Sequence, residues 1–443
     1  MALITDITIS IDSNRFDARI RHLNISQSIN KHHQFSIEFE LASVEGMLDH
    51  FLMDKSKDYV GSVIQISIKP VDFLKQHAEL NFKGVITNIS ANRANRRNGD
   101  MLTIQGYSPD ILIDETPNCK SFEEADIKQI FSEVLKPYPK NLLPLKSSPN
   151  SSEKFDYIVQ YNETNFNFLY RLAALNGEWF FYDGQNLHLG LDTGKETELE
   201  YGSDLIDFNF SMGVSPINFS FSAFSYSDVK TYSSSSKSAS ISGLNDNQKV
   251  SEKKSEGLYT SDNNQFLIHH SSNINQSSLD KIVKKVKGNK ISNAVVCSGQ
   301  SENTGVQIGQ IISISGKNMI METGPNYGQY LVVSVNHSSD LEGNYMNTFT
   351  AIPANITNNP FIVPQLFPRI ESQSAVVTDN SDPDKLGRIR VRFYWQEQKD
   401  SPWLRIVNPY AGDKRGAFII PEIGDEVMVQ FEGSNAEKPY VIG

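Results

Sequence analysis

The sequence predicts a mainly β chain with a few helices (α+β), built from small barrels and ending in an OB-fold barrel. Segments in which apolar and polar residues alternate occur toward both ends of the chain, and three separate segments have helical periodicity instead. Hydrophobic residues make up 39% and charged residues 21%, which is typical of a globular chain and not of a disordered one. Because 443 residues exceed one ordinary core, we expect about two to four domains.

The first 107 residues have the pattern of short strands. The alternating segments are 7–11, 35–39, 63–68, 82–89 and 101–107. The connector between the last two contains Arg93, Arg96, Arg97, Asn98 and Gly99, a composition that suits a hairpin tip. Short strands with this period predict a small barrel or sandwich.

Three helices are expected, near 122–136, 164–176 and 278–290. Ser121 and Glu124 have the spacing of a capping box, so they predict the start of the first helix. The second begins after Thr164 and ends before Gly177, which supplies the left-handed residue of a C-terminal cap. The third has an apolar side flanked by lysines.

A serine-rich stretch separates the second and third helices. Residues 228–262 are polar and poor in large apolar side chains, which favours an exposed loop or a partly disordered insertion over a functional tract. Strands resume beyond the third helix. Segments 82–107 and 330–352 share the plan of strand, polar tip and strand, each near a helix. Two related β domains explain this symmetry.

The C-terminal part, from residue 371, has the size of an OB-type barrel and follows a link rich in proline. Arg388, Arg390 and Arg392 alternate with apolar residues and place three cations on one face of a strand. Such a face could follow phosphates, but from residue 371 onward there are 9 Lys and Arg against 12 Asp and Glu, a net charge of 9 − 12 = −3. We therefore expect the arginines to pair with acids and the domain not to bind nucleic acid.

Charge and hydropathy exclude several other classes. A formal net charge of −11 argues against a general binder of nucleic acid or anionic membranes. No apolar run reaches the roughly 18 residues of a spanning helix, and no signal peptide is visible, so we expect export by another route. Cys119 and Cys297 lack CxxC partners and neighbouring histidines, which predicts two unpaired thiols.

No pattern typical of catalysis is present. His32 and His33 are adjacent, as are His269 and His270, and neighbours on a strand point to opposite faces, so neither pair forms a natural metal site. HExxH, GxSxG and phosphate-binding glycine motifs are missing from the sequence. We therefore expect no catalytic, cofactor-binding or metal-ligating residues, no cofactor, and a structural or assembly role.

Several segments together resemble the VgrG spike proteins of type VI secretion systems, which are related to the hubs and spikes of contractile phage tails. The strongest similarity is 382–395, DPDKLGRIRVRFYW, followed by 403–412 and 420–443. Upstream, 161–172 with Gly177 is similar to the hub segment of that family, and 330–337 is similar more weakly. The resemblance covers nearly the whole chain except the serine-rich stretch.

The resemblance implies a hub of two tail-tube-like β-barrel domains over residues 1–370 and an OB-fold domain over 371–443. It also implies a non-enzymatic homotrimer that matches the six-fold symmetry of a hexameric, Hcp-like tube protein. In such a system the spike assembles in the cytoplasm and is secreted by sheath contraction without a signal peptide. It contacts the target membrane transiently, punctures it and delivers effectors.

The family's C-terminal β-helical needle, which binds a PAAR-type tip protein and effectors, is expected to be absent from this chain, since it ends at Gly443. Two alternatives remain open: the hub of a phage or of an extracellular contractile injection particle, and a spike-associated wall-degrading enzyme.

Overall fold

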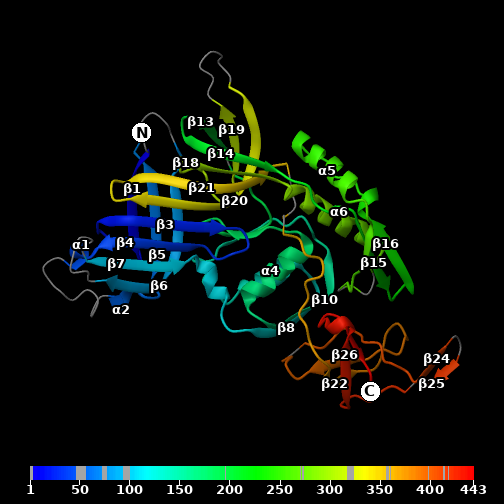
Figure 1. Ribbon diagram of the computed structural model, residues 1–443. Helices are drawn as coiled ribbons and strands as arrows, with labels where there is room; N and C mark the ends of the chain where they lie inside the picture. Colours follow the sequence, from blue (N-terminus) through cyan, green and yellow to red (C-terminus); the bar gives the residue numbers. More distant parts are fainter. Residues whose placement is uncertain are drawn as a thin grey trace.

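The fold is that of a computed structural model, which describes residues 3–45, 56–71, 77–92, 100–194, 196–269, 271, 274–316, 324–355, 359, 361–397, 399–412, 415–417 and 419–443. The expected hairpin tip at 93–99 lies outside the described residues, as does His270. Two barrels occupy one side of the molecule, a helical layer lies below them, a small α/β module lies beside them and a C-terminal sheet forms the far end (Figure 1).

Eight strands form the first barrel as a closed ladder of hydrogen bonds. β1 pairs with β5 along one edge and with β21 along the other, through Leu3 opposite Tyr345, so the ladder returns on itself. The alternating apolar residues fill its interior, where Leu23, Ile37 and Phe82 are fully buried. In spatial order the strands are β1 (Leu3–Ile11), β5 (Val63–Pro70), β6 (Leu80–Asn92), β7 (Met101–Tyr107), β4 (Gln34–Glu40), β3 (Ile20–Ser28), β20 (Asn326–Asp340) and β21 (Asn344–Pro353).

A second ladder closes with six strands and shares β20 and β21 with the first. Its other members are β18 (Val295–Ser301), β14 (Leu205–Met212), β13 (Thr197–Tyr201) and β19 (Ile311–Gly316). β19 pairs with the first half of β20, and β18 pairs with β21. Leu199, Ile312 and Phe349 belong to its separate apolar core. One chain therefore contains two closed β barrels joined by a common hairpin.

Short elements extend or connect the strands of the first barrel. They are β2 (Asn14–Arg15), α1 (Leu41–Glu45), α2 (Ser56–Tyr59) and the 3-10 turn η2 (Pro109–Ile113). The helical layer below the barrels has its own apolar core, in which Phe131, Phe168 and Leu187 are fully buried. It consists of β8 (Asn118–Asp126), α3 (Ile127–Leu135), β9 (Leu145–Ser147), β10 (Lys154–Glu163), α4 (Asn165–Asn176), β11 (Phe180–Tyr182) and β12 (Leu187–Leu189).

The capping box expected at Ser121 and Glu124 is wrong. Both residues lie in β8, which pairs with β10, and the helix begins later, at Ile127. Asp126 and Gln129 form the capping box in their place. Pairing with β10 keeps the preceding residues extended, so tertiary structure overrides the local signal. By contrast, α4 occupies the segment indicated by its caps: Thr164 accepts from an amide of the first turn, and Gly177 has φ +67°.

The expectation of a loop or partly disordered insertion at 228–262 is also wrong. Together with its flanks this segment forms an ordered α/β module (Figure 1), in which Phe219, Phe221 and Ala223 pack against α6. Serines fill many of the remaining positions, and Ser234, which lies opposite Phe221, donates from Oγ to Asp280 of α6 at 2.5 Å. The module consists of β15 (Phe219–Ser225), β16 (Lys230–Ser235), η3 (Ser236–Ser238), α5 (Asp246–Leu258), β17 (Asn263–Phe266) and α6 (Gln276–Ser292).

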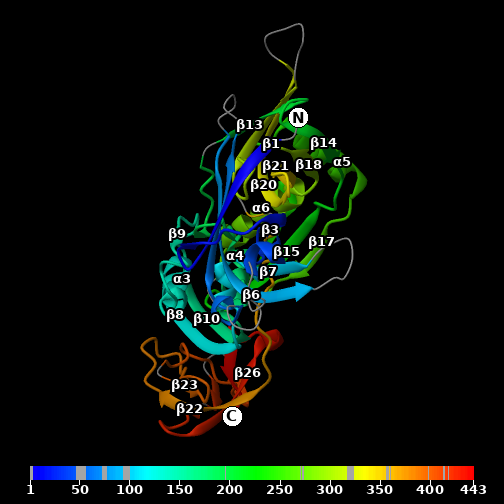
Figure 2. The same cartoon turned by 90° about the vertical axis from the view of Figure 1, so that its left-hand side faces the viewer.

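The C-terminal part is an OB-fold domain, and the chain as a whole is mainly β, as predicted. Its sheet has the order β23-β22-β26-β27, and bridges at Ile389 and Ile406 add further strand contacts. It extends away from the barrels (Figure 2). Its elements are β22 (Gln373–Asp379), β23 (Arg390–Phe393), β24 (Tyr410–Gly412), β25 (Arg415–Ala417), β26 (Glu426–Phe431), η4 (Glu432–Ser434) and β27 (Pro439–Val441).

A close approach inside the first barrel requires glycine at position 106 of β7. A Cβ there would overlap the Val85 carbonyl oxygen and lie 2.7 Å from the Phe35 ring. We expect Gly106→Ala to lower the free energy of unfolding by about 1–3 kcal/mol, because the ring and the strand must move apart. Urea titration followed by circular dichroism measures this change.

Gly288→Ala in α6 is the matched control, because the nearest atom to its added Cβ is Ile241 Cδ1 at 3.9 Å. A glycine in a helix interior costs up to about 1 kcal/mol relative to alanine, so this variant should unfold at the same or a higher urea concentration. Equal destabilisation by both substitutions would show that the contact at Phe35 is not the cause.

Candidate functional site

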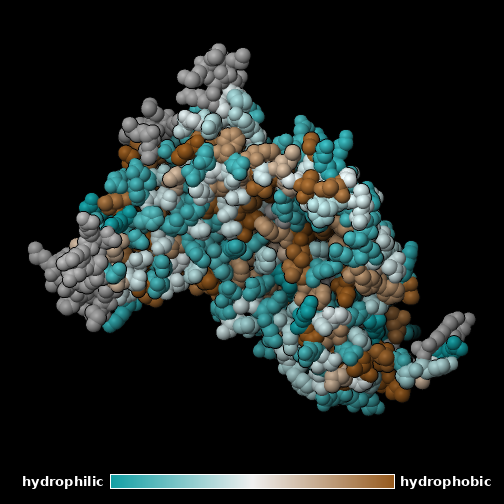
Figure 3. Space-filling model, in the orientation of Figure 1, coloured by the Kyte–Doolittle hydropathy of each residue, from teal (hydrophilic) through white to brown (hydrophobic). Residues whose placement is uncertain are grey.

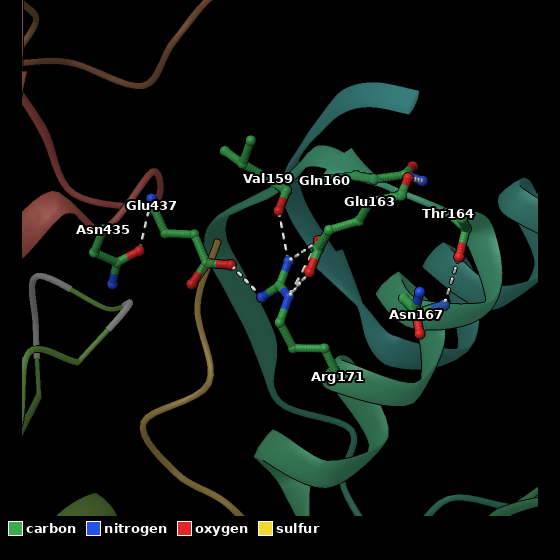
Figure 4. A network of polar contacts seen from close by, with 8 residues as sticks. All are labelled: Val159, Gln160, Glu163, Thr164, Asn167, Arg171, Asn435 and Glu437. Atoms are coloured by element: carbon green, nitrogen blue, oxygen red, sulfur yellow. Dashed lines mark hydrogen bonds and ion pairs between the residues drawn. The ribbon is translucent and has the colours of Figure 1, made fainter. Parts of the chain in front are cut away.

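Two segments singled out in the sequence, 161–172 and 420–443, meet in a buried ionic cluster (Figure 4). Arg171 of α4 donates from Nη1 to Glu437 Oε1 at 2.8 Å and from Nε to Glu163 Oε1 at 2.9 Å. Its Nη2 donates to the Val159 carbonyl oxygen at 2.6 Å. The side chain of Arg171 is 6% exposed and that of Glu437 is 1% exposed. The cluster joins the helical layer to the OB-fold domain.

Local structure fixes the position of each member of this cluster. Glu163 ends β10 two residues before α4 begins, and Arg171 lies in the second turn of that helix, from where its side chain reaches back to the Glu163 carboxylate. Asn435 Oδ1 accepts from the Glu437 amide at 2.9 Å and holds the loop that presents the second carboxylate. Gln160 Nε2 donates to the Glu163 carbonyl oxygen at 2.9 Å.

The cluster is held together by the attraction of opposite charges that are largely shielded from solvent. Burial opposes the guanidinium charge, but the attraction of Glu437 and Glu163 more than offsets it and raises the pKa of Arg171. Burial raises the pKa of Glu437, and the nearby Glu163 carboxylate adds to this effect, although Arg171 opposes it. Removing the arginine would leave the buried Glu437 and the partly buried Glu163 without a counter-charge, which is far more costly than losing an exposed pair.

Apolar packing and further polar contacts surround the cluster. Tyr157 and Val159 of β10 belong to the same apolar core as Val391 and Phe393 of the OB-fold domain. Gln396 Nε2 donates to Ser121 Oγ at 2.8 Å. The domain is therefore packed on β8 and β10 through a shared core and not tethered by a loose linker.

The three alternating arginines are paired with acids of the same chain. Arg388 pairs with Asp382 at 2.8 Å, and Arg392 pairs with Asp400 at 2.7 Å. Arg390 reaches from the OB-fold domain to the helical layer, a boundary that we call the joint, and contacts both carboxylate oxygens of Glu123 in β8. The pairing expected from the sequence is thus confirmed, and the arginine face is neutralised within the molecule.

The adjacent histidines His32 and His33 have separate partners. His32 bonds to Asp110 at 2.9 Å and to Asp114 at 3.2 Å, whereas His33 is buried and bonds to Gln27. Within the part of the chain that the structure describes, no three His, Cys, Asp or Glu residues are grouped so that they could hold a metal ion.

Both cysteines are free thiols, as predicted, and burial raises the pKa of Cys297 to about 12. That thiol therefore stays protonated and unreactive at neutral pH. No helix within the described ranges is long and apolar enough to cross a membrane.

Sequence reasoning missed the cluster of Glu163, Arg171 and Glu437, although one signal pointed to it. Arg171 occupies the apolar stripe of α4, at i+3 from Phe168 and i+4 before Leu175. A cation in such a stripe needs a buried acid. Its partner in the OB-fold domain is 266 positions away along the chain, so sequence spacing could not identify it.

Two family profiles match the chain. Residues 35–342 match the phage tail baseplate hub (GPD), and residues 373–443 match the type VI secretion system/phage-baseplate injector OB domain. Spike protein VgrG4b of Pseudomonas aeruginosa is 34% identical over 118 residues, 24% of this chain and 14% of that protein. VgrG3 of Vibrio cholerae is 31% identical over 133 residues, 26% of this chain and 13% of that protein. The matched segments thus span about a seventh of these relatives.

Solved structures share the fold at low sequence identity. The E. coli c3393 protein, described as a component of the type VI secretion system with similarity to T4 tail proteins gp27 and gp5, has a TM-score of 0.61 and 14% identity, with 98% of each chain covered. A Francisella PdpA–VgrG complex has a TM-score of 0.59 and 11% identity, over 99% of this chain and 78% of that one. A Neisseria meningitidis tail protein has a TM-score of 0.56 and 9% identity, over 81% and 99%.

Arg171→Met should lower the free energy of unfolding by about 3–5 kcal/mol, because it leaves the buried Glu437 and the partly buried Glu163 without a cation. Adding Glu437→Gln should restore part of the loss by removing one of those charges. Urea titration of the three proteins measures both effects.

Arg392→Met is the control, since its pair with Asp400 is partly exposed, at 44% and 27%, and such pairs contribute about 1 kcal/mol or less. If Arg171→Met lowers the free energy of unfolding no more than Arg392→Met does, the buried cluster does not stabilise the contact between the helical layer and the OB-fold domain.

Protonation of Asp382, in the loop before β23, should lower the stability of the protein in acid. Hydrogen bonds from the Arg388 side chain are the largest of the effects that hold the pKa of Asp382 well below its usual range. A depressed folded-state pKa gives stability that is present above the unfolded pKa of about 4 and lost as the pH falls below it. The urea midpoint of the wild type should therefore drop between about pH 5 and pH 2, whereas that of Asp382→Asn should be lower at neutral pH and fall less steeply. Parallel curves would contradict this assignment.

Proposed function

This chain belongs to the phage tail baseplate hub (GPD) family, and from that premise we propose that it is a structural, non-enzymatic spike and hub of a type VI secretion system. It assembles in the cytoplasm as a homotrimer, binds the hexameric tube protein, and is driven outward by sheath contraction. In the target cell it punctures the membrane and delivers effectors. A PAAR-type tip protein is a further partner in this proposal.

The observation that supports this function is the presence of two closed ladders in one chain. Three copies of a chain with two such barrels present six barrels around a three-fold axis, eight-stranded and six-stranded in alternation. A ring of six matches the symmetry of a hexameric tube, which a single barrel per chain would not. Closed ladders also leave few free strand edges, as suits a body that must withstand force without unzipping or aggregating.

An exposed apolar face on the second barrel supports self-association. Phe208 packs against the rings of Tyr201 at 5.6 Å and Tyr327 at 4.9 Å. Phe210 and Met212 continue the same alternation along β14 but are 37% and 46% exposed. We call these five residues the β14 face. Exposed aromatic and Met side chains in one place are typical of protein interfaces.

A second apolar surface lies on the OB-fold domain. Val407, Tyr410, Ile419 and Ile423 are each more than half exposed. Figure 3 shows hydrophobic side chains gathered over this end of the molecule. Two separate apolar surfaces, one on the barrels and one at the far end, suit copies that pack alongside one another over the length of the chain.

The hub of a phage tail or of another contractile particle is the second candidate, favoured by the similarity to phage tail proteins. Both candidates require the same trimeric hub, and they differ in the tube and tip proteins bound. Purification from the native cell with type VI tube and tip proteins supports the first, and purification with phage tail proteins supports the second.

The trimer is tested through the β14 face. We expect a mass in solution of about three times 49.7 kDa, measured by light scattering. Phe210→Asp combined with Met212→Asp should shift the mass to that of one chain, because burying two carboxylates in an apolar contact is unfavourable. Val250→Asp on α5 is the control, since Val250 is also apolar and 46% exposed but lies outside that face. A wild-type monomer, or a trimer unaffected by the double variant, would contradict the assignment.

A further inference from the structure

A cavity of about 620 Å³ lies between α4, α6 and the chain that precedes β10. One face of α6 lines it with Ser278, Lys281, Ile282 and Lys285, which are spaced at i, i+3, i+4 and i+7. We call this the α4–α6 cavity. Glu163, Arg171 and Glu437 do not line this cavity, so the cavity is separate from the ionic cluster.

The floor of the α4–α6 cavity is apolar. Phe155, Ile274 and Ile362 line it and are almost fully buried from solvent. Phe155 belongs to the core of the helical layer, whereas Ile274 and Ile362 belong to the core of the α/β module. The floor is therefore built where two cores meet, and its shape is fixed by packing on both sides.

The rim of the cavity is cationic in a chain whose net charge is −11. Lys285 Nζ donates to the Asn176 carbonyl oxygen at 2.7 Å, at the end of α4. Burial lowers the pKa of Lys285 against the attraction of the Glu178 and Glu153 carboxylates, and among the described residues no ion pair of Lys285 is formed. Its neighbour Lys287, by contrast, pairs with Glu252 at 3.0 Å and with a second acid of α5. Lys285 has donors left for an anion that enters the cavity.

Amides and hydroxyls complete the lining. Asn150, Ser151 and Asn176 line the cavity beside the apolar floor. The backbone amides of Asn150 and Ser151 donate to Glu178, and Asn176 Nδ2 donates to the Leu172 carbonyl oxygen, so a ligand would meet the other polar groups of these residues. An acyl chain needs only apolar contacts, whereas a peptide also needs partners for its backbone N–H and C=O groups. The mixture of apolar floor, hydrogen-bonding walls and cationic rim therefore favours a peptide over a lipid.

We propose that the α4–α6 cavity binds the carboxyl terminus of a polypeptide partner, with its last apolar side chains on the floor and its terminal carboxylate at Lys285. Lys281, which forms an ion pair with Glu153 at the rim, adds a second cation nearby. The inference goes beyond the proposed function and does not rest on it, because the cavity is complete within one chain. A spike or hub of any contractile system could use it to hold a partner.

Saturation-transfer NMR on the purified full chain tests the proposal with a pool of short acetylated peptides that end in Leu, Ile, Val or Phe. Peptides with a free carboxylate should bind saturably, and their carboxyl-terminal amides should bind at least about tenfold more weakly, since the charge-assisted hydrogen bond is lost. Lys285→Met should weaken the acids by the same factor, and Lys285→Arg should retain binding. Lys284→Met is the matched control, because Lys284 is exposed on the same helix and does not line the cavity.

Octanoate distinguishes a peptide carboxyl terminus from a fatty acid as the ligand of the cavity. It should compete with the peptides at least about tenfold more weakly than an unlabelled peptide acid, because it makes no backbone hydrogen bonds. Absence of saturable peptide binding, equal binding of acids and amides, or octanoate binding as tight as that of the peptides would each overturn the proposal. These readouts are independent of oligomeric state, so their failure is distinct from failure of the trimer.

Discussion

The hairpin of β20 and β21 is the constraint on which the rest of the structure depends, because both barrels close through it. The first half of β20 pairs with β19, its second half pairs with β3, and β21 pairs with β18 and β1. A buried polar chain ties these strands: Tyr345 bonds to His337 at 2.7 Å, and His337 bonds to Gln27 at 3.1 Å. Burial lowers the pKa of His337 to about 3, so this chain of hydrogen bonds stays uncharged at neutral pH. Distortion of the hairpin would open both ladders together.

The OB-fold domain is joined to this body by charge as well as by apolar packing. A single guanidinium, that of Arg171, binds Glu163 of the helical layer and Glu437 of the OB-fold domain. This contact fixes the OB-fold domain directly on the helical layer. The arginines at and before β23 likewise pair with acids, as Arg390 does with Glu123, and do not form a free basic surface.

Much of the fold could be predicted from the sequence, because strands with one buried face alternate and helices have caps, as α4 does at Thr164 and Gly177. The errors arose where distant partners decided the outcome. Ser121 became part of a strand because β10 pairs with β8. The serine-rich segment is ordered because aromatic residues of its sheet pack against α6. The role of Arg171 was missed for the same reason, since Glu437 is far away along the chain and only the fold brings the two together.

In the proposed trimer each chain contributes both of its barrels to one ring. Electron microscopy of the purified particle, viewed along its symmetry axis, tests this most directly. The account predicts a ring of six lobes with three-fold symmetry, in which adjacent lobes alternate between the first and second barrels. A ring of three lobes, or a particle in which the second barrel lies outside the ring, would contradict it.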